Sequence, residues 1–242
     1  YGTFNFNTPN FYWKFVKGKL IYQLSVSTYQ RFRYAYTYEN RSIYEQVINA
    51  TLQEKQQMFD FLENNALPEN KDYLYDFLYD NCSTRIRDVL IAIYGNSLIF
   101  DDLDTTLTFR QLIRSSLTDR HWDDLGVNIL LGTPTDKVVN THQYMFLPDN
   151  LMYCFDDAVI LKNGQPIPLV EKKATIFTGK AEEKQGSFFS PFLVFGTVLF
   201  IVLVYSVLAY RKQKWHKWLD LTLFIPFGIL GLLLILLWTA TD

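Results

Sequence analysis

Two long uncharged stretches near the end of the 242-residue chain constrain its architecture more than any other feature. They cover residues 188–210 and 221–241, and neither contains an Asp, Glu, Lys or Arg. A helix rises about 1.5 Å per residue, so each stretch is long enough to cross the roughly 30 Å hydrocarbon core of a bilayer. Buried helices of a soluble protein are the alternative, but they rarely reach this length. The sequence therefore predicts two membrane-spanning helices.

The short segment between these stretches predicts the orientation. Residues 211–220 contain four Lys or Arg and one Asp, with Trp215 and Trp218 among them. Short basic loops stay on the cytoplasmic side, and Trp is enriched at the membrane interface. If this loop is cytoplasmic, everything before residue 188 lies on the other side of the membrane. We therefore expect residues 1–187 to be extracytoplasmic.

Charge and reactive side chains exclude several classes of function. Without the basic loop, Asp220 and Asp242, residues 1–187 hold 19 basic and 23 acidic residues, a net charge of −4. This balance argues against binding of nucleic acid, and it predicts no polybasic patch for anionic lipid. Two Cys and three His are too few for a disulfide scaffold or a zinc-finger array. No cofactor and no metal site is predicted.

Local patterns predict a mixed α+β domain over residues 1–170, with a polar linker at 171–187. Alternation or β-propensity predicts strands at 1–6 and 19–26, and Asn163-Gly164 predicts the turn of a hairpin.

Capping signals predict where helices begin. Ser42 and Thr51 each stand three residues before a Glu, the spacing of a capping box, and Thr108 can cap a further helix. Another amphipathic helix is predicted to begin at Cys82-Ser83-Thr84 and to end at Gly95.

One segment carries recognisable chemistry. In Asp80-Asn81-Cys82-Ser83-Thr84-Arg85, a thiol stands in the first turn of a predicted helix. The positive end of the helix dipole and the free N–H groups stabilise a thiolate there. The same N–H groups can bind the oxyanion that forms when the thiolate attacks an acyl carbon. Arg85 either adds positive charge near the sulfur or pairs with Asp80 or Asp88. The predicted catalytic residues are therefore Cys82 as nucleophile, with Arg85 and Asn81 beside it.

Other interpretations of these residues remain open. Cys82 is equally compatible with a small buried hydrophobe or with a disulfide to Cys154, which an extracytoplasmic location permits. His121, close to Asp123, is a candidate base or metal ligand, and His142 is a candidate of the same kind. Solvated surface positions are the commoner role for such His residues.

Several segments, taken in order, resemble the Lnb-type periplasmic domain family. They are Tyr1-Gly2-Thr3-Phe4-Asn5-Phe6, residues 11–20 and residues 80–88. Residues 146–151 and 237–242 resemble bacterial members that carry a membrane region after this domain. The family is similar to permuted papain-like (NlpC/P60-like) thiol enzymes. The resemblance thus implies an α+β papain-like domain at 1–170, followed by a transmembrane helical hairpin.

The resemblance also implies an activity, lipoprotein N-acylation in the bacterial inner membrane with the soluble domain in the periplasm. Cys82 would carry the acyl chain as a thioester. The implied partners are the lipoprotein N-terminus and an acyl donor, either a phospholipid or diacylglycerol. The family's His base lies in a Gly-His segment just upstream of the strand that begins at Tyr1. We expect it before residue 1, in a natural chain that extends beyond both ends of this sequence.

Two alternative functions use the same residues differently. A cysteine peptidase or amidase acting on cell-wall peptides would keep Cys82 as the nucleophile. A non-catalytic subunit of a membrane complex would bury Cys82 or bond it to Cys154.

Overall fold

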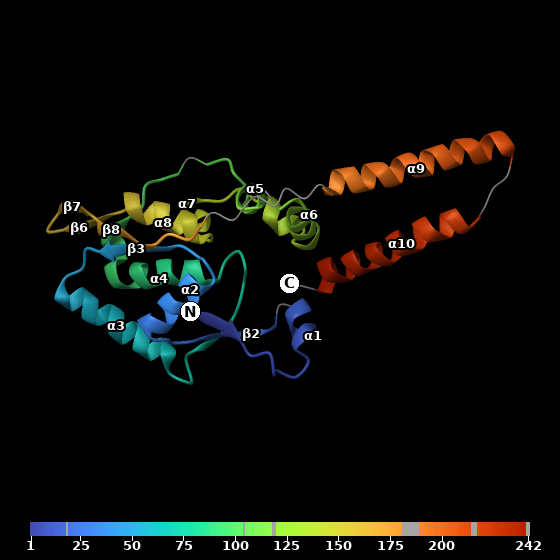
Figure 1. The fold of residues 1–242 in the computed structure, drawn as a ribbon. Helices are drawn as coiled ribbons and strands as arrows, with labels where there is room; N and C mark the ends of the chain where they lie inside the picture. The colour runs from blue at the N-terminus through green and yellow to red at the C-terminus, as the bar shows by residue number, and fades with distance from the viewer. Residues whose placement is uncertain (18, 104, 118–119, 181–188, 214–216, 241–242) are drawn as a thin grey trace. The chain divides into compact units, whose positions relative to one another are not determined.

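The computed structural model describes residues 1–17, 19–103, 105–117, 120–180, 189–213 and 217–240 (Figure 1). The chain divides into two compact units. The first unit comprises residues 1–109 and 138–181, and the second comprises residues 110–137 and 182–242.

The first unit combines short strands with helices, which confirms the mixed helix-and-strand prediction (Figure 1). Its strands are β1 (Gly2–Phe4), β2 (Ile21–Leu24), β3 (Ile43–Ile48), β4 (Asp72–Leu74), β5 (Leu98–Ile99), β6 (Val159–Lys162), β7 (Gln165–Pro168) and β8 (Val170–Phe177). Its helices are α1 (Phe11–Val16), α2 (Tyr29–Tyr38), α3 (Leu52–Ala66), α4 (Cys82–Tyr94), the 3-10 turn Gly95–Ser97, α7 (Thr141–Tyr144) and α8 (Pro148–Asp157).

The described strands form small antiparallel sheets with the orders β1-β2-β4, β3-β8 and β5-β6-β7. In the first sheet Phe4 pairs with Tyr22, and Tyr22 pairs with Tyr73. Side chains directly opposite each other lie on the same face of a sheet. The register therefore gathers aromatic rings along one line across the sheet.

A hydrophobic cluster fixes α4 at the centre of the first unit, where α4 contacts both α3 and α8. The cluster consists of Leu90, Tyr94, Leu98, Met145, Leu151, Phe155, Ala158, Ile160, Leu169 and Val170. Near the other end of α4, the fully buried Phe146 ring contacts Phe109, with ring centroids 5.0 Å apart. Burial at both ends holds α4 as a rigid element.

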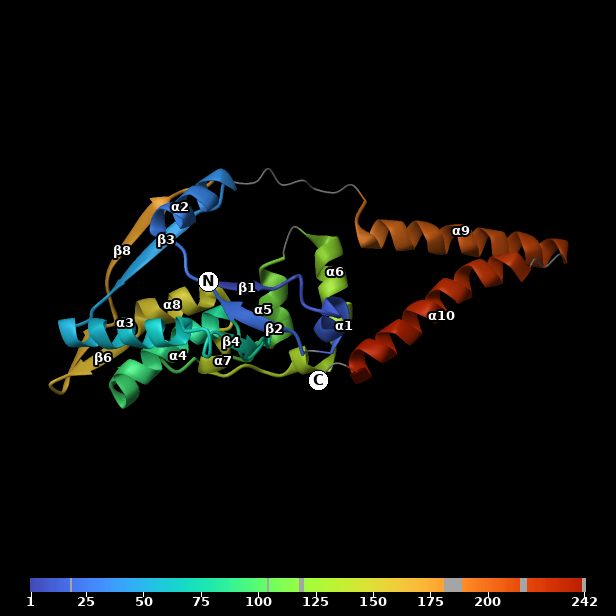
Figure 2. The same cartoon turned by 90° about the horizontal axis from the view of Figure 1, so that it is seen from below.

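Two sequence predictions for the first unit are wrong. Ser42 does not begin a helix, because residues 43–48 form β3. Residues 171–177, predicted as the start of the linker, belong to β8 and run antiparallel to β3 (Figure 2). Each strand satisfies the backbone groups of the other, and this pairing outweighs a local capping pattern. Residues 181–187 of the predicted linker lie outside the described residues.

Two other local predictions for this unit are confirmed. Thr51 and Glu54 form a complete capping box at the start of α3. Asn163 and Gly164 both have positive φ in the turn between β6 and β7, as a two-residue hairpin turn requires.

The second unit holds the membrane region. Its elements are α5 (Phe109–Ser115), which crosses the boundary between the units, α6 (His121–Leu130), the 3-10 turn Thr133–Asp136, α9 (Pro191–Lys212) and α10 (Lys217–Ala240). Both α9 and α10 are long and apolar enough to cross a membrane, and they can form a hairpin. Ser190 caps α9, so the first span begins at Pro191. The second begins earlier than predicted, because Lys217 to Asp220 are helical.

The α3 capping box predicts a pH-dependent stability. Burial disfavours the charged form of Glu54, but hydrogen bonds from the Thr51 N–H (2.6 Å) and the Lys162 ammonium (2.9 Å) outweigh it and lower the pKa of Glu54. Stability from a lowered pKa is present above the unfolded value, about 4.3 for Glu, and is lost as pH falls through the folded value. We expect Glu54→Gln to reduce the loss of thermal stability below about pH 4.5.

This effect is measured by thermal unfolding of the full chain in detergent across pH 3–7. Glu63→Gln removes an exposed carboxylate from the same helix and should leave the wild-type pH profile unchanged. An E54Q profile that falls as steeply as the wild-type one would contradict the prediction.

Candidate active site

Asn81 caps the start of α4. Its side chain is 5% exposed, and both polar atoms of its amide form hydrogen bonds. Its Oδ1 accepts hydrogen bonds from the N–H groups of Ser83 (2.8 Å) and Thr84 (3.1 Å). Its Nδ2 donates to the carbonyls of Phe77 (2.8 Å) and Phe146 (3.0 Å). One buried side chain thus caps the helix and ties it to two neighbouring segments. Asn81 positions Cys82, and its own polar atoms are fully engaged.

This cap changes the expected set of oxyanion donors. The N–H groups of Ser83 and Thr84 are bonded to Asn81 Oδ1, and the Arg85 N–H donates to the Asn81 carbonyl (3.0 Å). The sequence predicted that the first-turn N–H groups as a set could bind an oxyanion. Within the part of the chain that the structure describes, only the Cys82 N–H of these four has no acceptor. The helix therefore offers one donor, adjacent to the sulfur.

Both cysteines are free thiols, so the predicted alternative of a Cys82–Cys154 disulfide is not formed. Cys82 is exposed, which also argues against a buried hydrophobe. Cys154 lies on α8, partly buried beside the hydrophobic cluster, and burial raises the pKa of its thiol to about 11. A higher pKa leaves less of the reactive thiolate. The two thiols thus have different environments, and Cys82 is the accessible one.

A cluster of aromatic rings on and next to the first sheet lies beside Cys82, and we call Phe4, Tyr22, Tyr73 and Tyr75 the aromatic wall. The Tyr22 hydroxyl lies 3.7 Å from the Cys82 sulfur. The Tyr22 ring contacts the other three, with centroids 4.5 Å from Phe4, 5.5 Å from Tyr73 and 4.9 Å from Tyr75. Gly2 lies against the same ring, since a Cβ at this position would stand 1.9 Å from it.

The tyrosines of the aromatic wall stay protonated at neutral pH. Burial raises the pKa of Tyr22, Tyr73 and Tyr75, and the nearby Cys82 sulfur raises each of them further. A neutral phenol is a poor base but a competent O–H donor. At 3.7 Å, Tyr22 can donate to the sulfur, whose hydrogen bonds are longer than those of oxygen.

Arg85 is paired with Asp80, one of the alternatives that the sequence left open. Its Nη2 lies 2.7 Å from Asp80 Oδ2, and its Nε also donates to this carboxylate. The guanidinium stacks over the Tyr73 ring at 4.0 Å. Because Asp80 balances its charge, Arg85 contributes less positive field at Cys82 than a free Arg would. Its contacts orient Tyr73 instead.

The sequence analysis did not single out the tyrosines around Cys82. A period-2 signal was available, because Tyr73 and Tyr75 point to the same side of an extended segment. Nothing local connects them with Tyr22 or Cys82, which the sheet and α4 bring together.

The two candidate His residues are placed elsewhere. His142 lies on α7, where its ring contacts Phe100 at 5.8 Å and its carbonyl accepts from Arg87. His121 begins α6 in the second unit and lines a cavity of about 510 Å³ between α6 and the start of α9. No group of three His, Cys, Asp or Glu within the described ranges is arranged to hold a metal ion.

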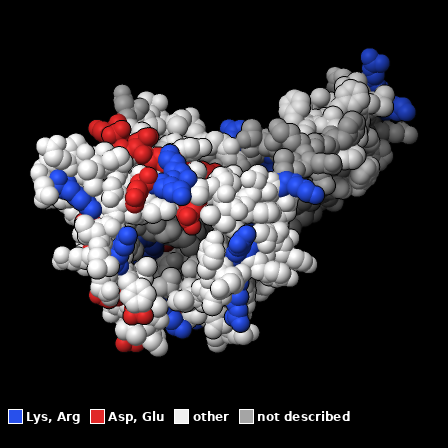
Figure 3. Space-filling model, turned by 60° about the vertical axis from the view of Figure 1, so that its left-hand side comes forward, with Lys and Arg blue, Asp and Glu red and all other residues white. Residues whose placement is uncertain are grey.

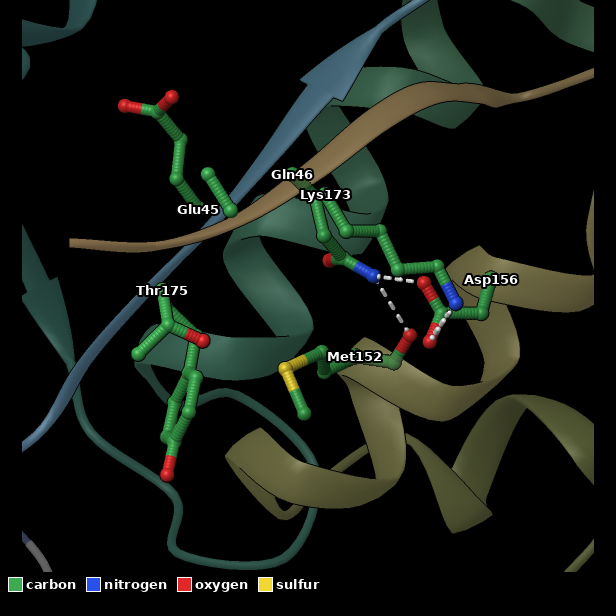
Figure 4. A pocket seen from close by; sticks show the side chains of 8 residues that line it. Glu45, Gln46, Met152, Asp156, Lys173 and Thr175 are labelled. Carbon is green, nitrogen blue, oxygen red and sulfur yellow. Dashed lines mark hydrogen bonds and ion pairs between the residues drawn. The ribbon is translucent and has the colours of Figure 1, made fainter. Parts of the chain in front are cut away.

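A separate cavity of about 210 Å³ lies between the β3–β8 sheet and α8 (Figure 4). Its polar side is a network in which Gln46 and Lys173 both reach the Asp156 carboxylate, with Lys173 Nζ 2.7 Å from Oδ2. Figure 4 shows Thr175 across the hollow from Asp156, while Met152 lies below Gln46 and its carbonyl accepts a hydrogen bond from the Gln46 amide (2.9 Å). Its lining includes neither Cys82 nor the aromatic wall. This network attaches the two-stranded sheet to α8.

Comparison with known families is consistent with this division of the chain. Residues 1–115 match the model described as the Lnb N-terminal periplasmic domain, and residues 182–242 match the Lnb transmembrane domain. No curated protein and no solved structure matches this sequence. The first match contains Cys82 and the aromatic wall, and the second contains both apolar helices. The molecule is therefore an inner-membrane protein with a soluble periplasmic domain, as the basic loop predicted.

The Asn81 cap can be tested by mutation. Asn81→Ala removes a buried amide that donates two hydrogen bonds and accepts two. We therefore expect it to lower the free energy of unfolding by about 1–3 kcal/mol. We also expect slower alkylation of Cys82, because the first turn of α4 loses its anchor. Both are measured on the full chain in detergent.

Asn140→Ala is the matched control, because Asn140 caps α7 through an exposed capping box. This variant should lose less stability and keep the wild-type alkylation rate of Cys82. Equal effects of the two substitutions would contradict the special role of Asn81.

Proposed function

Because this chain belongs to the Lnb-type family, we propose that it is a membrane-anchored lipoprotein N-acyltransferase with Cys82 as the acyl carrier. The observation that carries the proposal is an exposed thiol at the start of α4, beside its own unpartnered N–H. A nucleophile next to a donor for the developing oxyanion is the minimal arrangement for acyl transfer. Among the residues that the structure describes, none accepts a hydrogen bond from the Cys82 N–H.

The first half-reaction loads the enzyme. The Cys82 thiolate attacks the ester carbonyl of the donor lipid, and the negative charge on oxygen is stabilised by the Cys82 N–H. The C–O bond of the ester then breaks, a thioester bond forms, and the leaving alkoxide takes a proton from the protonated base. The products are an acylated Cys82 and a lipid with one free hydroxyl.

The second half-reaction unloads it. The α-amine of the lipoprotein N-terminus attacks the thioester carbonyl and gives its proton to the base. The C–S bond breaks, an amide bond forms, and Cys82 leaves as thiolate. Neither step needs a metal or a redox cofactor, and atoms and charge balance over the cycle. Each half-reaction has a lower barrier than direct aminolysis of an ester.

Two features support a papain-like arrangement for this chemistry. The nucleophile stands at the start of a helix that faces an antiparallel sheet, and β1 leads into the strand pair that carries Tyr22. The family resemblance assigns the base to a His just upstream of β1. Backbone hydrogen bonds between Tyr1 and Ser25 continue the pairing of β1 with β2, so Tyr1 lies in the same sheet as Phe4 and Tyr22.

The anchoring suits the proposed substrates. Acyl donors and lipidated protein N-termini are both held in the membrane, and α9 and α10 hold this chain there. Confinement to the same surface raises the effective concentration of enzyme and substrate without any added contact. The donor is a phospholipid or the lipoprotein's own diacylglycerol.

The central prediction concerns the nucleophile. Cys82→Ala and Cys82→Ser in the full-length natural protein should abolish N-acylation of a reporter lipoprotein, read by mass spectrometry of its N-terminal peptide. Cys154→Ala is the matched control and should retain activity, because that thiol is partly buried on α8. Mass spectrometry of the wild type should also find a fatty acyl group on Cys82.

Other outcomes would identify the alternatives. A reporter lipoprotein that is still N-acylated in the C82A variant would refute the role of Cys82 as nucleophile. Hydrolysis of cell-wall peptides without acyl-enzyme would favour a cysteine peptidase or amidase. A wild-type protein in which Cys82 carries no acyl group and resists alkylation would favour a non-catalytic subunit.

Tyr22 gives an independent test of the geometry. Tyr22→Phe keeps the ring in the aromatic wall but removes the hydroxyl 3.7 Å from sulfur. One lost hydrogen bond is worth roughly a factor of ten, so we expect about tenfold slower alkylation of Cys82 at pH 7 and slower N-acylation. Tyr75→Phe, in the same wall, should leave both rates unchanged. Identical rates for Y22F and the wild type would show that the hydroxyl plays no part.

A further inference from the structure

Helix α2 is the least covered helix of the first unit, and none of its ten residues is buried. Five of its side chains are aromatic, and two of these, Tyr34 and Tyr38, are 71% and 80% exposed. A lone helix of this length is marginal in water. Large exposed aromatic side chains on such a helix indicate a surface that contacts something else.

Charged residues are distributed very unevenly along the sequence that contains this helix. Residues 1–38 contain five Lys or Arg and no Asp or Glu, whereas residues 39–187 contain 14 basic and 23 acidic residues. On the face drawn in Figure 3, acidic side chains gather in one upper area beside basic ones, others lie at the lower edge, and several basic side chains stand among uncharged residues. The prediction of no basic patch relied on the net charge of the domain. The net charge of the whole domain does not show that residues 1–38 carry basic side chains and no acidic ones.

The exposed side chains of α2 fall on definite faces. At about 100° per residue, Arg31, Tyr34 and Tyr38 share one face of the helix. The Tyr34 and Tyr38 rings are stacked, with centroids 6.1 Å apart. Arg33 lies on the other side of the helix, about 160° from Arg31 and closer in the helical projection to Tyr29 and Tyr36. None of the described carboxylates forms an ion pair with Arg31 or Arg33, so both charges are available to an external anion.

The end of α2 is attached to the segment that leads to the membrane. Asn40, in the left-handed conformation, closes the helix, and its side chain makes two hydrogen bonds with the backbone of Lys180 (2.8 and 3.0 Å). Gly179 fits beside it because a Cβ would stand 2.2 Å from the Asn40 carbonyl. Pro191, the first residue of α9, is only eleven positions beyond Lys180. The end of α2 is therefore hydrogen-bonded to the segment that precedes the first membrane span in the sequence.

We infer that α2 is a membrane-surface helix whose partner is an anionic bilayer. Arg31 binds lipid phosphate on the face that it shares with Tyr34 and Tyr38, which occupy the interfacial layer that tyrosine favours. Arg33, on the other side of the helix, adds to the attraction of the anionic surface, which extends over about a Debye length. The bilayer is the partner of choice because the chain is already anchored in one and α9 begins eleven positions after Lys180. This contact does not depend on Cys82 chemistry, so it goes beyond the proposed acyl transfer.

Hydrogen exchange of the full chain in lipid nanodiscs tests the inference. Deuterium uptake of residues 29–38 is compared between discs of phosphatidylcholine alone and discs that also contain phosphatidylglycerol. We expect slower uptake in the anionic discs, with α3 as an internal reference that does not change. Each basic residue near an anionic surface contributes roughly a fivefold change in partitioning. Arg31→Gln combined with Arg33→Gln should therefore reduce binding by roughly 25-fold and abolish the lipid-dependent difference.

Lys55→Gln combined with Lys172→Gln is the matched control, because it removes the same charge from α3 and β8. This pair should keep the lipid-dependent protection. Equal uptake in the two lipids, or the same loss in both double variants, would overturn the inference. N-acylation of the reporter by R31Q/R33Q is measured separately, so failure of the membrane contact is distinguishable from failure of the catalytic proposal.

Discussion

The buried amide of Asn81 is the interaction on which the rest of the site depends. Its four hydrogen bonds define where α4 begins and connect that end to the carbonyls of Phe77 and Phe146. A buried polar group with all its partners is rigid, because any displacement leaves a donor or acceptor unsatisfied. The same cap occupies the neighbouring N–H groups, so the free donor is the one on Cys82 itself. Helix capping thereby selects both the position of the sulfur and the donor beside it.

Around that fixed point the site is aromatic and electrically balanced. The Asp80–Arg85 pair is closed on itself and stacks on Tyr73, which leaves neutral phenols as the nearest polar groups to the sulfur. Burial keeps these phenols protonated, so they act as donors and as apolar surface at once. Such an environment is compatible with a lipid acyl chain, and the acyl transfer that we propose would take its general base from outside the aromatic wall.

The membrane enters the function at two levels. The spans α9 and α10 confine the chain to the bilayer, and α2 presents Arg31, Tyr34 and Tyr38 to its surface in our proposal. The spans raise the effective concentration of the chain near membrane-held substrates. The contact of α2 would orient the periplasmic unit on the bilayer surface. Overall net charge is a poor guide to the second, because the acidic residues of the periplasmic unit lie after residue 38.

The sequence by itself determined the spans, their basic loop, the helix that starts at Cys82, the α3 capping box and the β6–β7 turn. Each depends on residues close together in the chain, whose physics is local. Only the tertiary structure decided the pairing of β3 with β8, the hydrogen bond from the Asn81 amide to the Phe146 carbonyl and the approach of Tyr22 to the sulfur. These contacts join residues 60 or more positions apart, as Tyr22 and Cys82 are. Long-range contacts form only when the whole unit packs, because their stabilisation must exceed the entropy of closing long loops.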